Sequence, residues 1–193
     1  MDEAGLIRDA QRGDVHAYNR LVLAFQDQAY GVAYRIMGDP AAAADITQDA
    51  MIAAYNALNS FKGGNYKAWL LRIVTNRCYD ELRRRKRRPQ SSLDAITDEN
   101  ESFSALEADQ PSPESIEATN ELLRAIQSCL EGLPDEQRIA AVLCDVEGYD
   151  YNEIARITRA SLGTVKSRMS RARAKLRDCL QGFGELLPAQ YRL

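Results

Sequence analysis

The sequence predicts an all-α protein made of two small helical domains that an acidic flexible linker joins. Apolar residues recur at helical spacing both before and after a segment that is rich in Ser, Asp, Glu and Pro. Glycine and proline stand where the periodic stretches begin and end, as they do at helix boundaries. We therefore expect domains at 1–90 and 114–181, the linker at 91–113 and a C-terminal tail at 182–193.

Three long helices are predicted in the first domain, over residues 15–37, 40–58 and 67–88. Gly38 ends the first helix, and Asp39 caps the second, which has Pro40 at its first position, where no N–H is needed. A loop with two adjacent glycines follows, and the third helix ends before Pro89. Each helix has an apolar stripe, so we expect the three to pack as a small bundle.

The second domain is predicted to end in a helix-turn-helix. Its first two helices, from about 114 and from 134, are closed by Gly132 and Gly148. Asp150 and Glu153 predict a capping box for a short third helix. After a turn at 159–160 comes a basic helix with one apolar face, formed by Val165, Met169, Ala172, Leu176 and Cys179.

Charge is distributed unevenly along a chain whose formal net charge is only -3. Residues 83–88 are all Lys or Arg, residues 89–123 contain neither, and residues 155–177 contain no Asp or Glu. A cationic helix on an acidic protein indicates a polyphosphate partner, and the helix-turn-helix layout indicates duplex DNA. Two interpretations of the acidic linker stay open: a flexible spacer, or a segment that shields a basic surface in the free protein.

The candidate contacts to duplex DNA lie on the basic helix, opposite its apolar face. Early residues of a recognition helix reach base edges, whereas flanking basic residues reach phosphates. The expected base-reading residues are Lys166, Ser167, Ser170 and Arg171. We expect Thr164 and Lys175 to contact the DNA backbone, and Arg168 and Arg173 lie at the margins of the face. The alternative is a solvated basic face without a ligand.

The helix over 67–88 presents a second and different polar face. It mixes cationic, amide, carboxylate and aromatic groups, namely Arg72, Asn76, Tyr79, Asp80, Arg83 and Arg87. The loop before it carries Phe61 and Tyr66 beside two glycines. Aromatic rings near cationic helices suit unstacked bases, since stacking contributes ~1–3 kcal/mol per base. Ordinary packing is the alternative for Phe61, and it is the preferred interpretation for Trp69.

A third candidate surface lies on the helix over 40–58. Carboxylates there flank an exposed aliphatic and an exposed aromatic side chain, and the set is Asp45, Gln48, Asp49, Ile52 and Tyr55. Such a face favours docking of a basic partner helix. A solvated acidic face is the alternative.

Several classes of protein are disfavoured. No nucleophile elbow, phosphate-cradling glycine motif or metal-spaced cluster is present, so an enzyme is the weakest class and we expect no cofactor and no metal. No apolar run is long enough for a membrane span, and the first residues do not resemble a secretory signal. Four scattered cysteines are expected to be free thiols of a cytoplasmic protein, at positions Cys78, Cys129, Cys144 and Cys179.

Three stretches together resemble bacterial RNA polymerase sigma factors of the extracytoplasmic-function (ECF) group. They read DITQDAMIAAYNALNSFKGG, WLLRIVTNRCYDELRRRKRRP and GYDYNEIARITRASLGTVKSRMSRARAKLR. The resemblance extends from about residue 6 to 180, and it is least specific in the linker. It implies a sigma region 2 helical bundle in the first domain and a sigma region 4 helix-turn-helix in the second.

The resemblance also implies partners: core RNA polymerase, promoter DNA and an anti-sigma factor. Region 2 implies docking on the clamp of the largest polymerase subunit through Asp45, Gln48, Asp49, Ile52 and Tyr55. Region 4 implies contact with the flap of the second subunit and reading of the −35 element by Thr164, Lys166, Ser167, Ser170, Arg171 and Lys175. Capture of −10 bases is implied for Phe61, Lys62, Arg72, Asn76, Tyr79, Asp80, Arg83, Arg84 and Arg87. At Ser170 the family is variable and often has a bulkier residue.

Two other functions compete with promoter recognition by a sigma factor. The first is a two-domain repressor or activator that uses the same recognition helix. The second is an adaptor whose acidic helix binds a basic partner and whose helix-turn-helix has lost its function. Transcription with purified core polymerase separates the three, because only a sigma factor gives specific transcripts.

Overall fold

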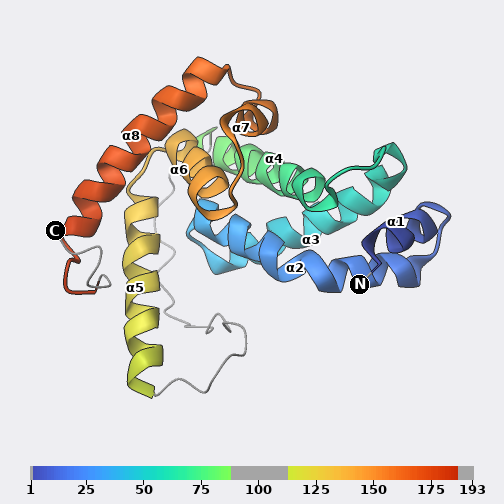
Figure 1. Cartoon of the computed structure of the whole chain (residues 1–193), viewed down its shortest axis with the longest axis horizontal. Coiled ribbons are helices and arrows are strands. Elements are labelled where there is room, and N and C mark those ends of the chain that lie inside the picture. The colour runs from blue at the N-terminus through green and yellow to red at the C-terminus, as the bar shows by residue number, and fades with distance from the viewer. Residues whose placement is uncertain (1, 88–112, 187–193) are drawn as a thin grey trace.

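The computed structural model describes residues 2–87 and 113–186 of the chain. Every regular element among these residues is a helix, which confirms the all-α prediction (Figure 1). The predicted linker lies almost wholly outside the described residues, as does the end of the predicted tail. The exact domain boundaries therefore stay a prediction.

Four α-helices form the first domain. They are α1 (Glu3–Gln11), α2 (Val15–Met37), α3 (Pro40–Ala57) and α4 (Tyr66–Arg87), with a 3₁₀ turn at Leu58–Ser60 after α3. The predicted boundaries of α2, α3 and α4 agree with the structure to within one residue. Helix α1 was not predicted, because its nine residues are too few to establish a helical period.

Capping and small side chains explain how α2 and α3 meet. The Asp39 side chain accepts hydrogen bonds from the backbone N–H groups of Ala41 and Ala42 at 3.0 and 3.3 Å, as the sequence predicts. Gly38, with φ of 69°, makes the turn between the helices in the left-handed region that favours glycine. Ala43, Ala50 and Ala54 are fully buried, which brings the α3 backbone close to α2.

The second domain contains α5 (Pro113–Glu131), α6 (Asp135–Ala141), α7 (Tyr151–Thr158) and α8 (Leu162–Gln181). A π-helical turn, Val142–Val146, continues α6, where a single regular helix was predicted. Such a turn holds one extra residue and is not visible in the apolar period, so it could not be predicted from the sequence. The core of the domain is fully buried around Ile139, Leu143, Ile154 and Met169.

The turn of the helix-turn-helix contains a strained residue. The capping box is present as predicted: Asp150 accepts from the N–H of Glu153 at 2.8 Å, and Glu153 accepts from the N–H of Asp150 at 3.0 Å. At the other end of α7, Arg159 has φ of 52°. A side chain in this left-handed conformation costs about 1–2 kcal/mol, which a glycine avoids.

Arg159→Gly is therefore expected to raise the free energy of unfolding by about 0.5–1 kcal/mol, because relief of strain exceeds the added entropy of the unfolded chain. Urea denaturation of this variant, of the control below and of the parent protein measures the free energy of unfolding. The matched control is Arg156→Gly, an exposed position inside α7, which should lower the same quantity by about 1 kcal/mol. Equal losses from both substitutions would contradict the strain argument.

The two domains pack against each other, with α5 beside α2 and α7 beside α4 (Figure 1). The Glu147 carboxylate, only 6% exposed, accepts a hydrogen bond from Gln28 Nε2 at 3.1 Å and lies 3.3 Å from Lys67 Nζ. Lys86, in the last turn of α4, pairs with Asp135 at the start of α6 at 2.8 Å. Polar contacts thus join the domains at both ends of α4.

The cysteines differ from the prediction. Cys78 and Cys144 are free thiols, as expected, but Cys129 on α5 and Cys179 on α8 form a disulfide. The two residues are far apart in sequence, and only the packing of α8 on α5 brings them together. For this pair the expectation of free thiols was wrong.

Within the described residues, none of the helices has the length and apolar character needed to cross a bilayer. The same residues contain no group of three or more His, Cys, Asp or Glu side chains that could hold a metal ion.

Candidate nucleic-acid interface

Helix α8 exposes most of the predicted DNA-reading residues. Val165, Met169 and Ala172 are buried against the rest of the domain, so the opposite side of the helix faces outward. The exposed residues of that side are Thr164, Lys166, Ser170, Arg171 and Lys175, and Ser167 is half-buried. The structure therefore brings the six candidates together on one helix face.

The first turn of α8 is fixed by its N-cap. Ser161 Oγ accepts a hydrogen bond from the backbone N–H of Thr164 at 3.1 Å, and the two hydroxyl oxygens lie 2.8 Å apart. The positive end of the helix dipole lies at this turn, and a phosphate group is stabilised in such a position. The location of Thr164 thus suits the contact to the DNA backbone that the sequence predicts.

Two arginines of α8 are engaged within the protein. Arg168 pairs with Glu136 at the start of α6, and Arg173 pairs with Asp145 in the π-helical turn. The hydrogen bond from Arg173 to Asp145 raises the pKa of the guanidinium further above its usual value. Both residues were expected at the margin of the DNA face, yet here they hold α8 on its neighbours. Their acidic partners lie in other helices, and sequence spacing did not reveal them.

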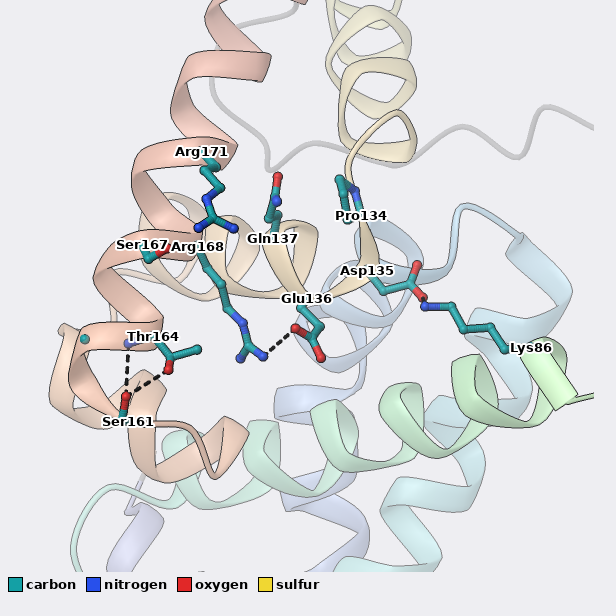
Figure 2. A pocket seen from close by; sticks show the side chains of 11 residues that line it. Lys86, Pro134, Asp135, Glu136, Gln137, Ser161, Thr164, Ser167, Arg168 and Arg171 are labelled. Carbon is teal, nitrogen blue, oxygen red and sulfur yellow. Dashed lines mark hydrogen bonds and ion pairs between the residues drawn. The ribbon is translucent and has the colours of Figure 1, made fainter.

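The predicted DNA-reading face of α8 borders a groove of about 660 Å³ that also reaches the end of α4. Figure 2 shows Ser167, Arg168 and Arg171 on one side, Lys86 on the other, and Glu136 and Gln137 between them. The side chain of Lys86 extends to Asp135 across the gap between the domains. The first domain therefore stands directly beside the expected −35 face.

The predicted −10 face of α4 is partly covered. Arg72, Asp80 and Arg83 are exposed, while Asn76 and Tyr79 are half-buried. Burial raises the pKa of the Tyr79 phenol, and its hydroxyl has no hydrogen-bond partner among the described residues.

The surroundings of Tyr79 include the second domain. Arg168 and Glu136 lie near enough to act electrostatically on its phenol, and the Arg83 guanidinium lies 5.8 Å from the centre of its ring. The side of α4 that carries Tyr79 therefore faces the helix-turn-helix domain.

The basic end of α4 is partly neutralised by acids of its own domain. Glu81 pairs with Arg84 at 2.6 Å and with Arg85 at 3.1 Å, and these bonds, that to Arg84 foremost, lower the pKa of the Glu81 carboxyl. Arg85 also pairs with Asp39 at 2.9 Å. Arg87 remains exposed and donates only to the backbone oxygen of Arg83 in the described structure.

Phe61 is packed inside the first domain. Its side chain is 8% exposed, and its ring centre lies 5.7 Å from that of Tyr66 and 5.3 Å from that of Trp69. Gln11 fixes the same loop by donating to the backbone oxygen of Phe61 at 2.9 Å. In this arrangement the packing interpretation holds for Phe61 and Trp69, whereas the adjacent Lys62 is exposed.

The five candidate docking residues of α3 share an exposed face. Asp45, Gln48 and Asp49 are exposed, and Ile52 and Tyr55 are 54% and 39% exposed although they are large and apolar. A groove of about 520 Å³ between α3 and α4 meets this face at Asp45 and Asp49 and is also lined by Arg77, Asp80 and Arg84. Arg77 was not predicted to belong to it, because its position depends on how α3 packs on α4.

Both domains match families of known proteins. Residues 21–88 match the Sigma-70 region 2 family and residues 123–176 match Sigma-70, region 4. The chain is 36% identical to the RNA polymerase sigma-H factor of Pseudomonas aeruginosa, with 91% of this chain and 92% of that protein covered. It is 38% identical to the ECF RNA polymerase sigma-E factor of Escherichia coli, with 91% and 93% covered.

A third relative is longer than the chain. The ECF RNA polymerase sigma factor SigE of Mycolicibacterium smegmatis is 37% identical, and the aligned part is 85% of this chain but only 62% of that protein.

Two solved structures are similar along most of their length. The sigma factor RpoE from Bartonella quintana, solved with the anti-sigma factor NepR, aligns with a TM-score of 0.66 and 27% identity over 86% of this chain and 98% of that one. CnrH, solved with the cytosolic domain of CnrY, aligns with a TM-score of 0.62 and 28% identity over 92% and 96%.

Proposed function

Because the chain belongs to the ECF family of RNA polymerase sigma factors, we propose that it is a promoter-specificity subunit which binds core RNA polymerase and directs initiation at promoters with its own −10 and −35 elements. The main support is the exposed polar face of α8, opposite its buried stripe, in a domain that matches region 4. Because core polymerase and chromosomal DNA are in the cytoplasm, we expect the protein to act there. It contributes recognition, and the polymerase carries out the chemistry.

Helix α8 reads the −35 element in the major groove. Arg171 and Lys166 can donate to guanine edges, and Ser167 and Ser170 can bond to several bases.

Thr164, at the capped first turn, and Lys175, two turns beyond Ser167, contact phosphates on either side. Because Arg168 and Arg173 are held by Glu136 and Asp145, sequence recognition falls to Lys166, Ser167, Ser170 and Arg171.

Region 2 captures unpaired bases of the −10 element through α4 and the loop before it. Arg72, Arg83, Arg84 and Arg87 attract the backbone, while Asn76, Tyr79 and Asp80 face the bases. Lys62 is exposed beside them. Phe61 is packed in the free protein, so its participation requires the loop over 61–65 to rearrange.

The exposed α3 face docks on the clamp of the largest polymerase subunit, and region 4 docks on the flap of the second subunit. The α3 face combines exposed Ile52 and Tyr55 with carboxylates, which is the composition expected of a helix-on-helix contact with a basic partner. Polymerase binding then holds the two domains at the spacing of the two promoter elements.

The packed arrangement of the domains does not fit bound DNA. A duplex that enters the groove beside Ser167 and Arg171 needs the space next to Lys86, and a base that stacks near Tyr79 needs space on the side facing region 4. We therefore expect the domains to separate when the factor engages polymerase and promoter. The contacts of Glu147 and Lys86 oppose this separation.

Glu147→Lys is expected to open the free protein, because it places a cation against Lys67 in place of a nearly buried carboxylate. Small-angle X-ray scattering should show a larger radius of gyration, and binding of a −35 duplex should tighten about tenfold. Glu121→Lys makes the same charge change at an exposed site on α5 and should alter neither quantity beyond a small general attraction. If both variants behave alike, the domain contact does not restrict DNA binding.

An anti-sigma factor is the expected regulator. The sigma factor RpoE, which has a similar fold, was solved in complex with the anti-sigma factor NepR, and this supports the assignment for the present chain. Such a partner can hold the protein inactive by binding its polymerase or DNA faces. Copurification of the tagged chain from its native cell, followed by mass spectrometry, would identify it.

The decisive experiment is transcription with core polymerase that lacks any sigma factor. The purified chain and a promoter library should yield run-off transcripts from specific start sites, and sequencing of these transcripts defines both elements. A repressor would bind duplex tightly without polymerase and give no transcript. Absence of specific transcripts with an active core enzyme would reject the proposed function.

A further inference from the structure

A cysteine pair in the second domain is not used by the proposed function. Cys129, near the end of α5, and Cys179, in the last turns of α8, are joined where these two helices lie side by side (Figure 1). Their Cα atoms are 5.8 Å apart, within the 4.4–6.8 Å typical of natural disulfides. The backbone therefore already accommodates the bond, and the reduced and oxidised proteins can share one fold.

We propose that Cys129 and Cys179 are a reversible modification site: a peroxide oxidises the thiol pair to the disulfide, and the bond then locks the recognition helix onto α5 without changing the DNA-reading face. This inference goes beyond the proposed function, and its chemical part does not depend on it. Cytosolic disulfides are usually transient rather than structural, which favours a bond that forms and is reduced again.

The order of the steps follows from exposure. Cys179 is partly exposed, whereas Cys129 is 2% exposed, so a peroxide reaches Cys179 first. The Cys179 thiolate attacks one peroxide oxygen, the O–O bond breaks, and the departing hydroxide takes up a proton to give water and a sulfenic acid. Cys129 then attacks the sulfenic sulfur, its thiol proton leaves with the displaced hydroxide as a second water, and the S–S bond forms. The thiol pair loses two electrons and the peroxide gains them; a dithiol reductant reverses the change.

The two remaining cysteines are poor competitors for the oxidant. Cys78 is fully buried in the first domain, and burial raises the pKa of its thiol to about 12. Cys144 is half-buried, and desolvation also raises the pKa of its thiol, despite a contact with Arg173 at 3.6 Å. Both shifts reduce the share of thiolate, which is the form that attacks a peroxide. Oxidation is thus directed to Cys129 and Cys179.

The position of the bridge explains why DNA reading should be preserved. Cys179 continues the stripe of Val165, Met169 and Ala172, which faces the core of the domain, and it lies eight residues beyond Arg171 and about 80° from it around the helix axis. At 1.5 Å per residue, Cys179 lies about 12 Å along the helix from Arg171. The bond instead stabilises the folded domain by lowering the conformational entropy of the unfolded chain, because it closes a loop between residues separated by 50 positions. We expect the melting temperature of the domain to rise by about 10 °C on oxidation.

The test compares the full chain after hydrogen peroxide and after dithiothreitol. Free thiols are blocked, the protein is digested without reduction, and mass spectrometry identifies linked peptides; scanning calorimetry gives the melting temperature of each form. We expect a 129–179 linked peptide, a rise of about 10 °C on oxidation and its reversal by dithiothreitol. Cys144→Ser should behave like the parent, and Cys129→Ser and Cys179→Ser should show neither the linked peptide nor the rise.

Three outcomes would overturn the proposal: no linked peptide, a link that involves Cys78 or Cys144 instead, or links only between molecules. A tenfold or larger change in −35 duplex affinity on oxidation would overturn the claim that the reading face is unaffected. If a serine variant fails to fold, the comparison of oxidised and reduced parent still decides. Linked peptides and melting temperatures need neither polymerase nor promoter, so failure here is distinguishable from failure of the sigma-factor assignment.

Discussion

Asp49→Arg is expected to weaken binding of the chain to core RNA polymerase by at least a hundredfold. Asp49 is exposed on α3, beside Asp45 and the groove toward α4, so the substitution replaces a carboxylate by a cation on the proposed docking face. Like charges brought together at an interface cost several kcal/mol, and each 1.4 kcal/mol is a factor of ten in affinity. Binding to polymerase that carries a fluorescent label on its clamp measures the loss.

The control for this prediction is Asp27→Arg, which makes the same charge change at an exposed position of α2. It should leave polymerase affinity within about threefold of the parent. Asp49→Arg should also leave the affinity of the helix-turn-helix domain for −35 duplex unchanged, because α3 belongs to the other domain. Equal loss of polymerase and duplex binding would indicate misfolding rather than a lost interface.

Arg171→Ala is expected to reduce binding of a −35 duplex by 1–3 kcal/mol, about five- to 150-fold, and to relax the preference at one base pair. Arg171 is exposed in the middle of α8 and makes no ion pair among the described residues, in contrast to Arg168 and Arg173. A bidentate contact to guanine accounts for an effect of this size. Binding of duplexes randomised at each −35 position, in the presence of polymerase, locates the affected base.

Lys175→Ala is the matched comparison on the same helix face. A phosphate contact carries no sequence information, so this variant should bind all duplexes more weakly by a similar factor. It should also lower the slope of log affinity against log salt by about one. If Arg171→Ala gives this uniform pattern as well, Arg171 contacts the backbone and base reading rests on Lys166, Ser167 and Ser170.

Much of the fold could be predicted because its determinants are local. Asp39 with Pro40, the capping box of Asp150 and Glu153, and the buried stripe of α8 are each contained within one or two helical turns of sequence. The exposure of the predicted DNA-reading face of α8 follows from that stripe, since the opposite side of the helix points outward. The three motifs and their order then predicted the family, which the comparisons confirm.

What could not be predicted depends on contacts between distant segments. The partners of Arg168 and Arg173 lie in α6 and in the π-helical turn, and no spacing rule connects them. The disulfide depends on the packing of α8 on α5, and the partial burial of Tyr79 depends on one domain lying against the other. Phe61 shows the same limit: its residue type suits both stacking on a base and packing, and its packing against Tyr66 and Trp69 in the free protein became visible only in the structure.

The π-helical turn at Val142–Val146 determines the direction in which the residues directly after it point from the helix axis. Each residue of an α-helix advances the chain by about 100°, so one inserted residue changes the direction in which Glu147 points by roughly a quarter of a revolution. In the observed phase Glu147 faces Gln28 and Lys67. Deletion of one residue from this turn would swing the carboxylate away while leaving the composition of the contact surface intact. The mutual orientation of the two halves of the protein is thus encoded in helix length as well as in charge.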